Sequence, residues 1–226
     1  MTLTRREFST SLVAAGLAGS GVAAHAQGAR FVEGVNYVRL VQPMPPAVAG
    51  KIEVTEFFWY ECPHCNTFEP ALEAWAKKLP DDVVLKRVPV WFREEPFSVQ
   101  QRLYYAIESL ELVPTLHRRV FYAIHNDRQR LRSPEEIAAF MLKNGVDPMK
   151  FMASYNSFSV QAKAQQARQI AAAYKIDAVP AMGVQGRYYT NGGLANAGGA
   201  PASPTAANER MLAVVDSLVA KVRQGG

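Results

Sequence analysis

Apolar and polar positions in the first third of the chain predict a strand, a helix and a second strand. Residues 51–59 are rich in β-branched and aromatic side chains, which is typical of a buried strand. From Asn66 to Leu79, apolar side chains recur at helical spacing until Pro80 ends the pattern. Residues 83–90 have the composition of another strand. This order of elements predicts the opening of a parallel α/β unit.

The middle of the chain has helical patterns with no strand pattern between them. These patterns cover residues 98–110, 115–125, 134–142, 148–155 and 160–174. Ser133 and Glu136 form an S-x-x-E capping box, with Pro134 at the first helical position. We therefore expect an inserted helical subdomain.

Strand patterns return at residues 178–184 and 186–190, which we expect to pair as a hairpin. Residues 192–207 are rich in Gly, Ala and Pro, and we expect them to form a loop. Apolar positions from Glu209 to Val222 lie on one face of a final helix. The predicted fold class is therefore α/β with an all-helical insertion.

The composition is that of an ordinary folded domain. Of the 226 residues, 49% are hydrophobic and 20% are charged, which fits one domain or one domain with an insertion. The formal net charge is +5, and the Lys and Arg residues are spread along the chain. We interpret the densest basic stretch, residues 128–132, as solvated surface, and we expect no nucleic-acid partner.

Residues 1–26 have the pattern of an export signal. Arg5 and Arg6 precede a weakly apolar stretch that is too short to span a bilayer. Ala24-His25-Ala26 forms an A-x-A cleavage site, so Gln27 is the expected first mature residue. The paired arginines resemble a twin-arginine signal, but Ser9 and Thr10 depart from that pattern. We predict export by either the twin-arginine or the general route.

The chain has two cysteines, Cys62 and Cys65. A disulfide that closes so small a loop restrains little chain entropy, so we expect its role to be chemical. A C-x-x-C motif beside a βαβ-like pattern is typical of a redox pair. At a helix N-terminus, unpaired N–H groups and the helix dipole stabilise a thiolate on the first cysteine. Pro63 suits the first helical position, and His64 adds a donor and, when protonated, a positive charge.

A stabilised thiolate raises the reduction potential because it favours the dithiol and makes Cys62 a good leaving group. We predict that Cys62 is the exposed attacking sulfur and Cys65 the shielded resolving one. A zinc site would need two more ligands, and His117 and His125 lie in the helical insert. A c-type haem site would need histidine where Asn66 stands. A structural disulfide and a binding module with an incidental bridge are further alternatives. We expect no metal and no dissociable cofactor.

Two segments resemble the DsbA family of periplasmic thiol oxidases. The first is E-F-F-W-Y-E-C-P-H-C-N-T-F-E-P from Glu56 to Pro70, and the second is V-P-A-M-G-V-Q-G from Val179 to Gly186. The resemblance extends from about Gln27 to the end of the chain. It implies a thioredoxin fold in two pieces, with the helical domain inserted between them. The implied pieces are residues 27–94 and 166–226, and the implied insertion is residues 95–165.

The resemblance also implies site residues beyond the motif. It implies a cis peptide bond between Val179 and Pro180, packed beside the C-P-H-C motif, where an extended substrate pairs by strand addition. Glu56 lies in an otherwise apolar strand and matches a buried acidic residue of the family. This carboxylate would take the proton that Cys65 releases when it attacks. We expect Glu53, in contrast, to be an exposed strand carboxylate.

The implied activity is donation of the Cys62–Cys65 disulfide to reduced, newly exported proteins in the periplasm. The implied enzyme is a monomer that the inner-membrane quinone reductase DsbB reoxidises. A periplasmic reductase or isomerase is the alternative within the redox class. A holdase that binds unfolded chains, with incidental redox activity, is the alternative from another class. Glu61 departs from the family pattern and directly precedes Cys62. Its negative charge predicts a potential less oxidising than that of the strongest family members.

Overall fold

The computed structural model describes residues 31–92, 98–199 and 201–226 of the chain. The export signal predicted at residues 1–26 lies outside the described residues. Among the described residues, no helix combines the length and apolar character needed to cross a membrane.

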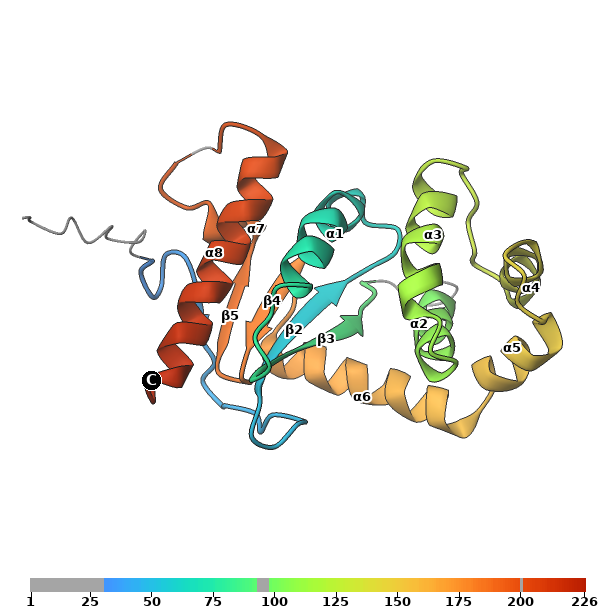
Figure 1. Cartoon of the computed structure of the whole chain (residues 1–226), viewed down its shortest axis with the longest axis horizontal. Coiled ribbons are helices and arrows are strands. Elements are labelled where there is room, and N and C mark those ends of the chain that lie inside the picture. The colour runs from blue at the N-terminus through green and yellow to red at the C-terminus, as the bar shows by residue number, and fades with distance from the viewer. Residues whose placement is uncertain (1–30, 93–97, 200) are drawn as a thin grey trace, which may run out of the picture. The chain divides into compact units, whose positions relative to one another are not determined.

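Within the described residues, a five-stranded mixed sheet has the order β1-β5-β4-β2-β3 (Figure 1). Its parallel pair is β2 (Ile52–Phe58) and β3 (Val83–Pro89), joined by α1 (Pro63–Ala76). This unit confirms the predicted strand, helix and strand. The predicted hairpin is also confirmed by β4 (Ala181–Val184) and β5 (Tyr188–Asn191), and β4 pairs antiparallel with β2.

The segment before β2 contributes an edge strand that the sequence analysis missed. β1 (Val38–Arg39) pairs antiparallel with β5. Further along, the N–H of Met44 donates to the carbonyl of Gly186 in the β4–β5 turn (2.8 Å). Gly186 has φ of +61°, and a Cβ there would clash with the carbonyl of Met44, so this close approach requires glycine.

Between β3 and β4, the described residues form the helical insertion. Its helices are α2 (Val99–Ser109), α3 (Val113–His125), α4 (Pro134–Lys143), α5 (Pro148–Tyr155) and α6 (Phe158–Tyr174). These bounds agree closely with the five predicted helices. Helix α6 is continuous across the boundary that we placed between residues 165 and 166, and it leads from the insertion back to the sheet (Figure 1).

The two faces of the sheet pack in separate hydrophobic clusters. On one face, Val54 and Met182 lie in a hydrophobic cluster that includes Phe68 of α1 and Val215 of α8 (Pro204–Arg223). On the other face, Phe57 lies in the cluster that includes Tyr174 of α6, with ring centroids 4.9 Å apart. Because both faces are covered, all seven residues of β2 are buried.

Two expectations were wrong. Residues 192–207 are not one loop, because α7 (Gly192–Ala195) forms within them and α8 starts at Pro204. Asn191 and Ser203 act as N-caps for these helices, accepting from the N–H groups of Leu194 (2.9 Å) and Ala206 (3.1 Å). Local capping therefore outweighs the Gly- and Pro-rich composition.

Glu53 was expected to be an exposed carboxylate, but only 7% of its surface is exposed. The carboxylate accepts hydrogen bonds from the N–H of Ala47 (3.0 Å) and the hydroxyl of Thr55 (3.2 Å). It also lies 3.8 Å from the ammonium of Lys86. These partners compensate the cost of burying the Glu53 carboxylate.

Candidate active site

The C-P-H-C motif forms the start of α1. Cys62 is the N-cap residue with extended backbone (φ −79°, ψ 116°), and Pro63 occupies the first helical position. Both cysteines are free thiols in the structure. No described side chain caps this helix end, so the N–H groups of the first turn face the Cys62 sulfur.

This placement separates the acidities of the two thiols. The pKa of Cys62 is lowered to about 6, chiefly by a hydrogen bond from the Cys65 thiol. Burial opposes this effect, whereas the N–H groups of Cys65 and His64 and the charge of His64 strengthen it. Burial raises the pKa of Cys65 well above its usual value. Cys62 is therefore the better thiolate at neutral pH.

The prediction that Cys62 is exposed was wrong, although Cys62 is the more accessible of the pair. Its exposed fraction is 8%, and that of Cys65 is 0%. The Cys62 thiol donates to the carbonyl oxygen of Val179 (3.4 Å), so the loop before β4 packs over the sulfur. The Val179–Pro180 peptide bond is cis, as the family resemblance implied.

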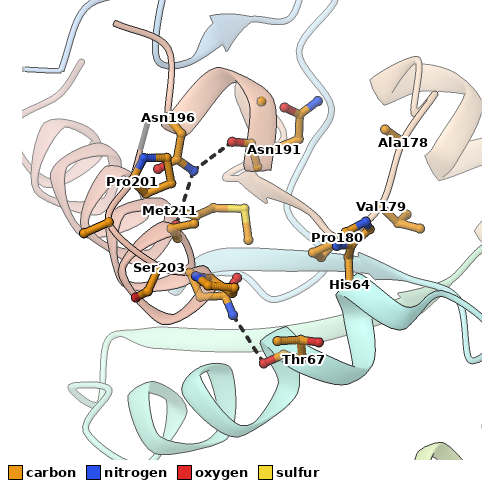
Figure 2. Close-up of a pocket in the computed structure, with 16 residues that line it drawn as sticks. His64, Thr67, Ala178, Val179, Pro180, Asn191, Asn196, Pro201, Ser203 and Met211 are labelled. Atoms are coloured by element: carbon orange, nitrogen blue, oxygen red, sulfur yellow. Dashed lines mark hydrogen bonds between the residues drawn. The ribbon is translucent and has the colours of Figure 1, made fainter. Parts of the chain in front are cut away.

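A groove of about 800 Å³ opens beside the motif (Figure 2). One wall includes His64 and Thr67 of α1, and another includes Val179 and Pro180. The far wall comes from the end of β5, α7, residues 201–203 and α8. The sequence analysis gave no function to residues 192–207. The lining residues there are Asn191, Gly192, Gly193, Asn196, Pro201, Ala202, Ser203, Pro204, Ala207, Asn208 and Met211.

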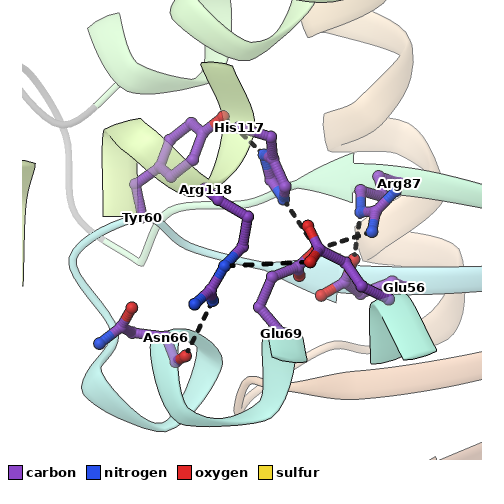
Figure 3. Close-up of polar contacts among 8 residues, drawn as sticks. Glu56, Tyr60, Asn66, Glu69, Arg87, His117 and Arg118 are labelled. Carbon is purple, nitrogen blue, oxygen red and sulfur yellow. Dashed lines mark hydrogen bonds and ion pairs between the residues drawn. The ribbon is translucent and has the colours of Figure 1, made fainter. Parts of the chain in front are cut away.

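A buried polar cluster links β2, β3, α1 and α3 (Figure 3). Glu56 is fully buried and forms an ion pair with Arg87 of β3 (3.0 Å). Arg87 also binds Glu69 of α1 (2.7 Å). Nε2 of His117 lies 3.4 Å from the Glu69 carboxylate, and its Nδ1 lies 2.8 Å from the Tyr60 hydroxyl.

The carboxylates of Glu56 and Glu69 share the guanidinium of Arg87. Their pKa values are shifted in opposite directions. Burial, followed by repulsion from Glu69, raises the pKa of Glu56 well above its usual value. His117 and Arg87 overcome the effect of burial and lower the pKa of Glu69. Burial lowers the pKa of His117. The cluster therefore favours the ionised form of Glu69 and the neutral form of His117, and it disfavours ionisation of Glu56.

The sequence analysis missed Glu69, Arg87 and the role of His117, which it weighed only as a metal ligand. Two signals were present in the chain. Glu69 follows Cys65 by one helical turn, and Arg87 lies directly opposite Glu56 in the parallel register. Among the described residues, no three His, Cys, Asp or Glu side chains are arranged to hold a metal ion.

Glu61, directly before the motif, forms an ion pair with a residue of the insertion. The guanidinium of Arg132 donates to its carboxylate, with Nε 2.6 Å from Oε1. Arg132 belongs to the stretch that we interpreted as solvated surface, and for this residue the interpretation was wrong. The ion pair explains why Arg132 is partly buried.

A thioredoxin fold that presents a low-pKa thiol beside a shielded one defines a thiol:disulfide oxidoreductase. Comparison with known proteins narrows this class. The chain belongs to the DsbA family. The family model for the DSBA-like thioredoxin domain matches residues 89–197, which include the insertion and the cis-proline loop.

Relatives match over most of their length. Thiol:disulfide interchange protein DsbA of Bordetella parapertussis is 44% identical over 96% of this chain and 98% of its own. DsbA of Azotobacter vinelandii is 40% identical over 84% of each chain. The crystal structure of Pseudomonas aeruginosa DsbA superposes with a TM-score of 0.78 at 38% identity, covering 86% of this chain and 96% of that one. The crystal structure of DsbA from Xylella fastidiosa superposes with a TM-score of 0.74 at 31% identity, covering 85% of this chain and 98% of that one.

Proposed function

We propose that this protein oxidises newly exported proteins in the periplasm by donating its Cys62–Cys65 disulfide. The observation that carries the proposal is the lowered pKa of Cys62, about 6. A thiolate that is stable at neutral pH favours the dithiol form over the disulfide, so the disulfide is a strong oxidant.

The exchange has two steps. A substrate thiolate attacks Sγ of Cys62, the Cys62–Cys65 bond breaks, and Cys65 leaves with the electron pair. Because the pKa of the Cys65 thiol is raised, the leaving sulfur takes up a proton. Glu56, whose carboxyl has a raised pKa, supplies this proton. The second substrate thiolate then attacks the substrate sulfur of the mixed disulfide, and Cys62 leaves as a thiolate. The substrate is oxidised by two electrons and the protein is reduced.

The remaining motif residues support these steps. Pro63 starts the helix whose N–H groups face Cys62, and His64 lowers the pKa of Cys62. Val179 contacts the sulfur of Cys62 through its carbonyl, and both Val179 and Pro180 line the groove. An extended chain can pair there with the Val179 backbone. The groove gives room for unfolded substrates of varied sequence.

The proposed setting follows from the sequence. The export signal at residues 1–26 supports a periplasmic location, and the family resemblance supports reoxidation by the inner-membrane quinone reductase DsbB. We propose that the protein acts as a monomer, with the cysteine pair as its redox group and no dissociable cofactor.

The reduction potential of the pair tests the proposal. Mature protein would be equilibrated in glutathione buffers, and the free thiols would be alkylated and counted by mass. A potential near the ~−120 mV of a strongly oxidising DsbA supports a disulfide donor. A potential near or below the ~−270 mV of thioredoxin would instead indicate a reductase or isomerase.

A binding assay addresses the remaining alternative. A Cys62→Ser/Cys65→Ser variant should no longer promote refolding of a reduced substrate protein, because oxidation requires both sulfurs. If the double variant protects unfolded chains from aggregation as well as the wild type does, the holdase interpretation gains support.

A further inference from the structure

The turn that leads into Cys62 is hydrogen-bonded to the helical insertion. The carbonyl of Tyr60 accepts a hydrogen bond from Nε2 of His125 in α3 (2.8 Å). The hydroxyl of Tyr60 lies 2.8 Å from His117 in the same helix. The insertion therefore contacts the backbone and the side chain of this residue, two positions before the redox cysteine.

Glu61, the next residue, is held by two side chains that we call the Glu61 clasp, Gln100 and Arg132. Arg132 donates to both carboxylate oxygens, with Nε 2.6 Å from Oε1. Nε2 of Gln100 donates to the same Oε1 (2.8 Å) and to the carbonyl of Arg130 (3.0 Å). The Glu61 side chain is only 11% exposed, so water screens this charge weakly.

Glu61 directly precedes Cys62 in the chain. Adjacent Cα atoms are about 3.8 Å apart, so a weakly screened charge on Glu61 is placed to act on the neighbouring thiolate. An uncompensated carboxylate there would disfavour the Cys62 thiolate and lower the reduction potential. The paired guanidinium of Arg132 supplies the opposite charge at the same place.

We propose that Arg132 is a positioning residue for disulfide exchange, which acts through Glu61 by cancelling its negative charge beside the Cys62 thiolate. The helical insertion thus contributes to setting the reduction potential of a cysteine pair that lies outside it. This inference rests on the proposed role of Cys62 as the attacking sulfur.

Charge cancellation and simple bracing of the turn predict different results. If Arg132 cancels the charge, Arg132→Gln leaves Glu61 uncompensated, which raises the pKa of Cys62 and makes the protein less oxidising. Glu61→Gln removes the negative charge, so it lowers the pKa of Cys62 and makes the protein more oxidising. In the double variant Glu61→Gln/Arg132→Gln, the reduction potential returns towards that of the wild type. If the clasp only braces the turn, both single variants shift the potential in the same direction.

The experiment compares these variants in glutathione buffers, with thiolate absorbance reporting the pKa of Cys62. We expect Arg132→Gln to change the equilibrium constant with glutathione by ~tenfold, which corresponds to about 30 mV. Arg132→Lys keeps the charge, so its reduction potential should be close to that of the wild type, even if its unfolding midpoint falls. Lys163→Gln removes another ion pair of the insertion (Lys163–Glu108, 2.8 Å) and is the matched control.

Opposite shifts in the two single variants, with recovery in the double variant, would support the inference. Shifts of the same sign, or no shift beyond the Lys163→Gln control, would overturn it. These outcomes concern differences between variants. They are therefore independent of the absolute wild-type potential, on which the proposed function depends.

Discussion

The thiol of Cys62 donates a hydrogen bond to the carbonyl oxygen of Val179, with 3.4 Å between sulfur and oxygen. The contact joins the start of α1 to the cis-proline loop before β4. It exists only while Cys62 is protonated, because a thiolate has no proton to donate. The contact is therefore absent both when Cys62 is ionised and in the Cys62–Cys65 disulfide, and the Val179 carbonyl can then accept the N–H of a substrate strand.

The roles of the two sulfurs predict different products from single cysteine variants. Cys65→Ser should accumulate mixed disulfides with substrate proteins through Cys62, because the resolving thiol is absent. Cys62→Ser should form few such conjugates, since Cys65 is fully buried. Non-reducing gels of periplasmic extracts would detect them. Equal trapping by both variants would contradict the assignment.

The lowered pKa of Cys62 predicts a pH-dependent stability of the reduced protein. The folded value is about 6, below the ordinary value of 9.0. The thiolate therefore stabilises the folded dithiol form in full above the higher value, and this contribution is lost as the pH falls through the lower one. Thermal unfolding should show that the reduced form gains stability relative to the oxidised form as the pH rises from about 6 to about 9. Cys62→Ser has no disulfide form, and its stability should lack this dependence on pH. A difference between the two wild-type forms that does not vary with pH would refute the shift.

Replacing the buried carboxyl of Glu56 should slow proton transfer to Cys65. Glu56→Gln keeps the shape of the side chain but removes its proton exchange with Cys65. We expect the rate of mixed-disulfide formation from the oxidised protein to fall on the order of 10²-fold. Stopped-flow fluorescence with a model dithiol would measure this rate. Glu53→Gln, a buried carboxylate of the same strand bound to other partners, is the control and should react at the wild-type rate.

A substitution at Gly183 in β4 should lower the stability of the fold, although this residue has no direct catalytic role. A Cβ at this position would lie 2.6 Å from Cζ of the buried Tyr174 ring. We expect Gly183→Ala to destabilise the protein by about 1–3 kcal/mol, because the ring or the strand must move. Urea unfolding would measure the change. Gly192→Ala has no atom within 4 Å of the new Cβ and should be close to neutral.

Local signals predicted much of the site. The C-P-H-C motif contains its own helix start, and the residues around Val179 and Pro180 form a contiguous second motif. Both could be recognised without knowing how the chain folds. The burial of Cys62 could not be predicted in this way, because the atom that covers its sulfur comes from Val179, far along the chain.

The buried polar cluster was the least predictable part. Glu69, Arg87 and His117 come from α1, β3 and α3, and each charged group alone has the appearance of a surface residue in the sequence. Only packing brings Arg87 between the carboxylates of Glu56 and Glu69. The same holds for Arg132, whose partner Glu61 lies in another part of the chain.

The order of the sheet has a consequence for how the protein folds. β2 lies between β3, which follows after a single helix, and β4, which follows after the whole insertion. Val54 pairs with Val184, about 130 positions later, so closing this pair carries a large loop-entropy cost. The local unit of β2, α1 and β3 holds both cysteines and can form early, while the Val179 loop can reach them only when the distant strand docks. The covered redox centre is therefore a late product of folding, and slow-folding molecules would expose both sulfurs before the groove exists.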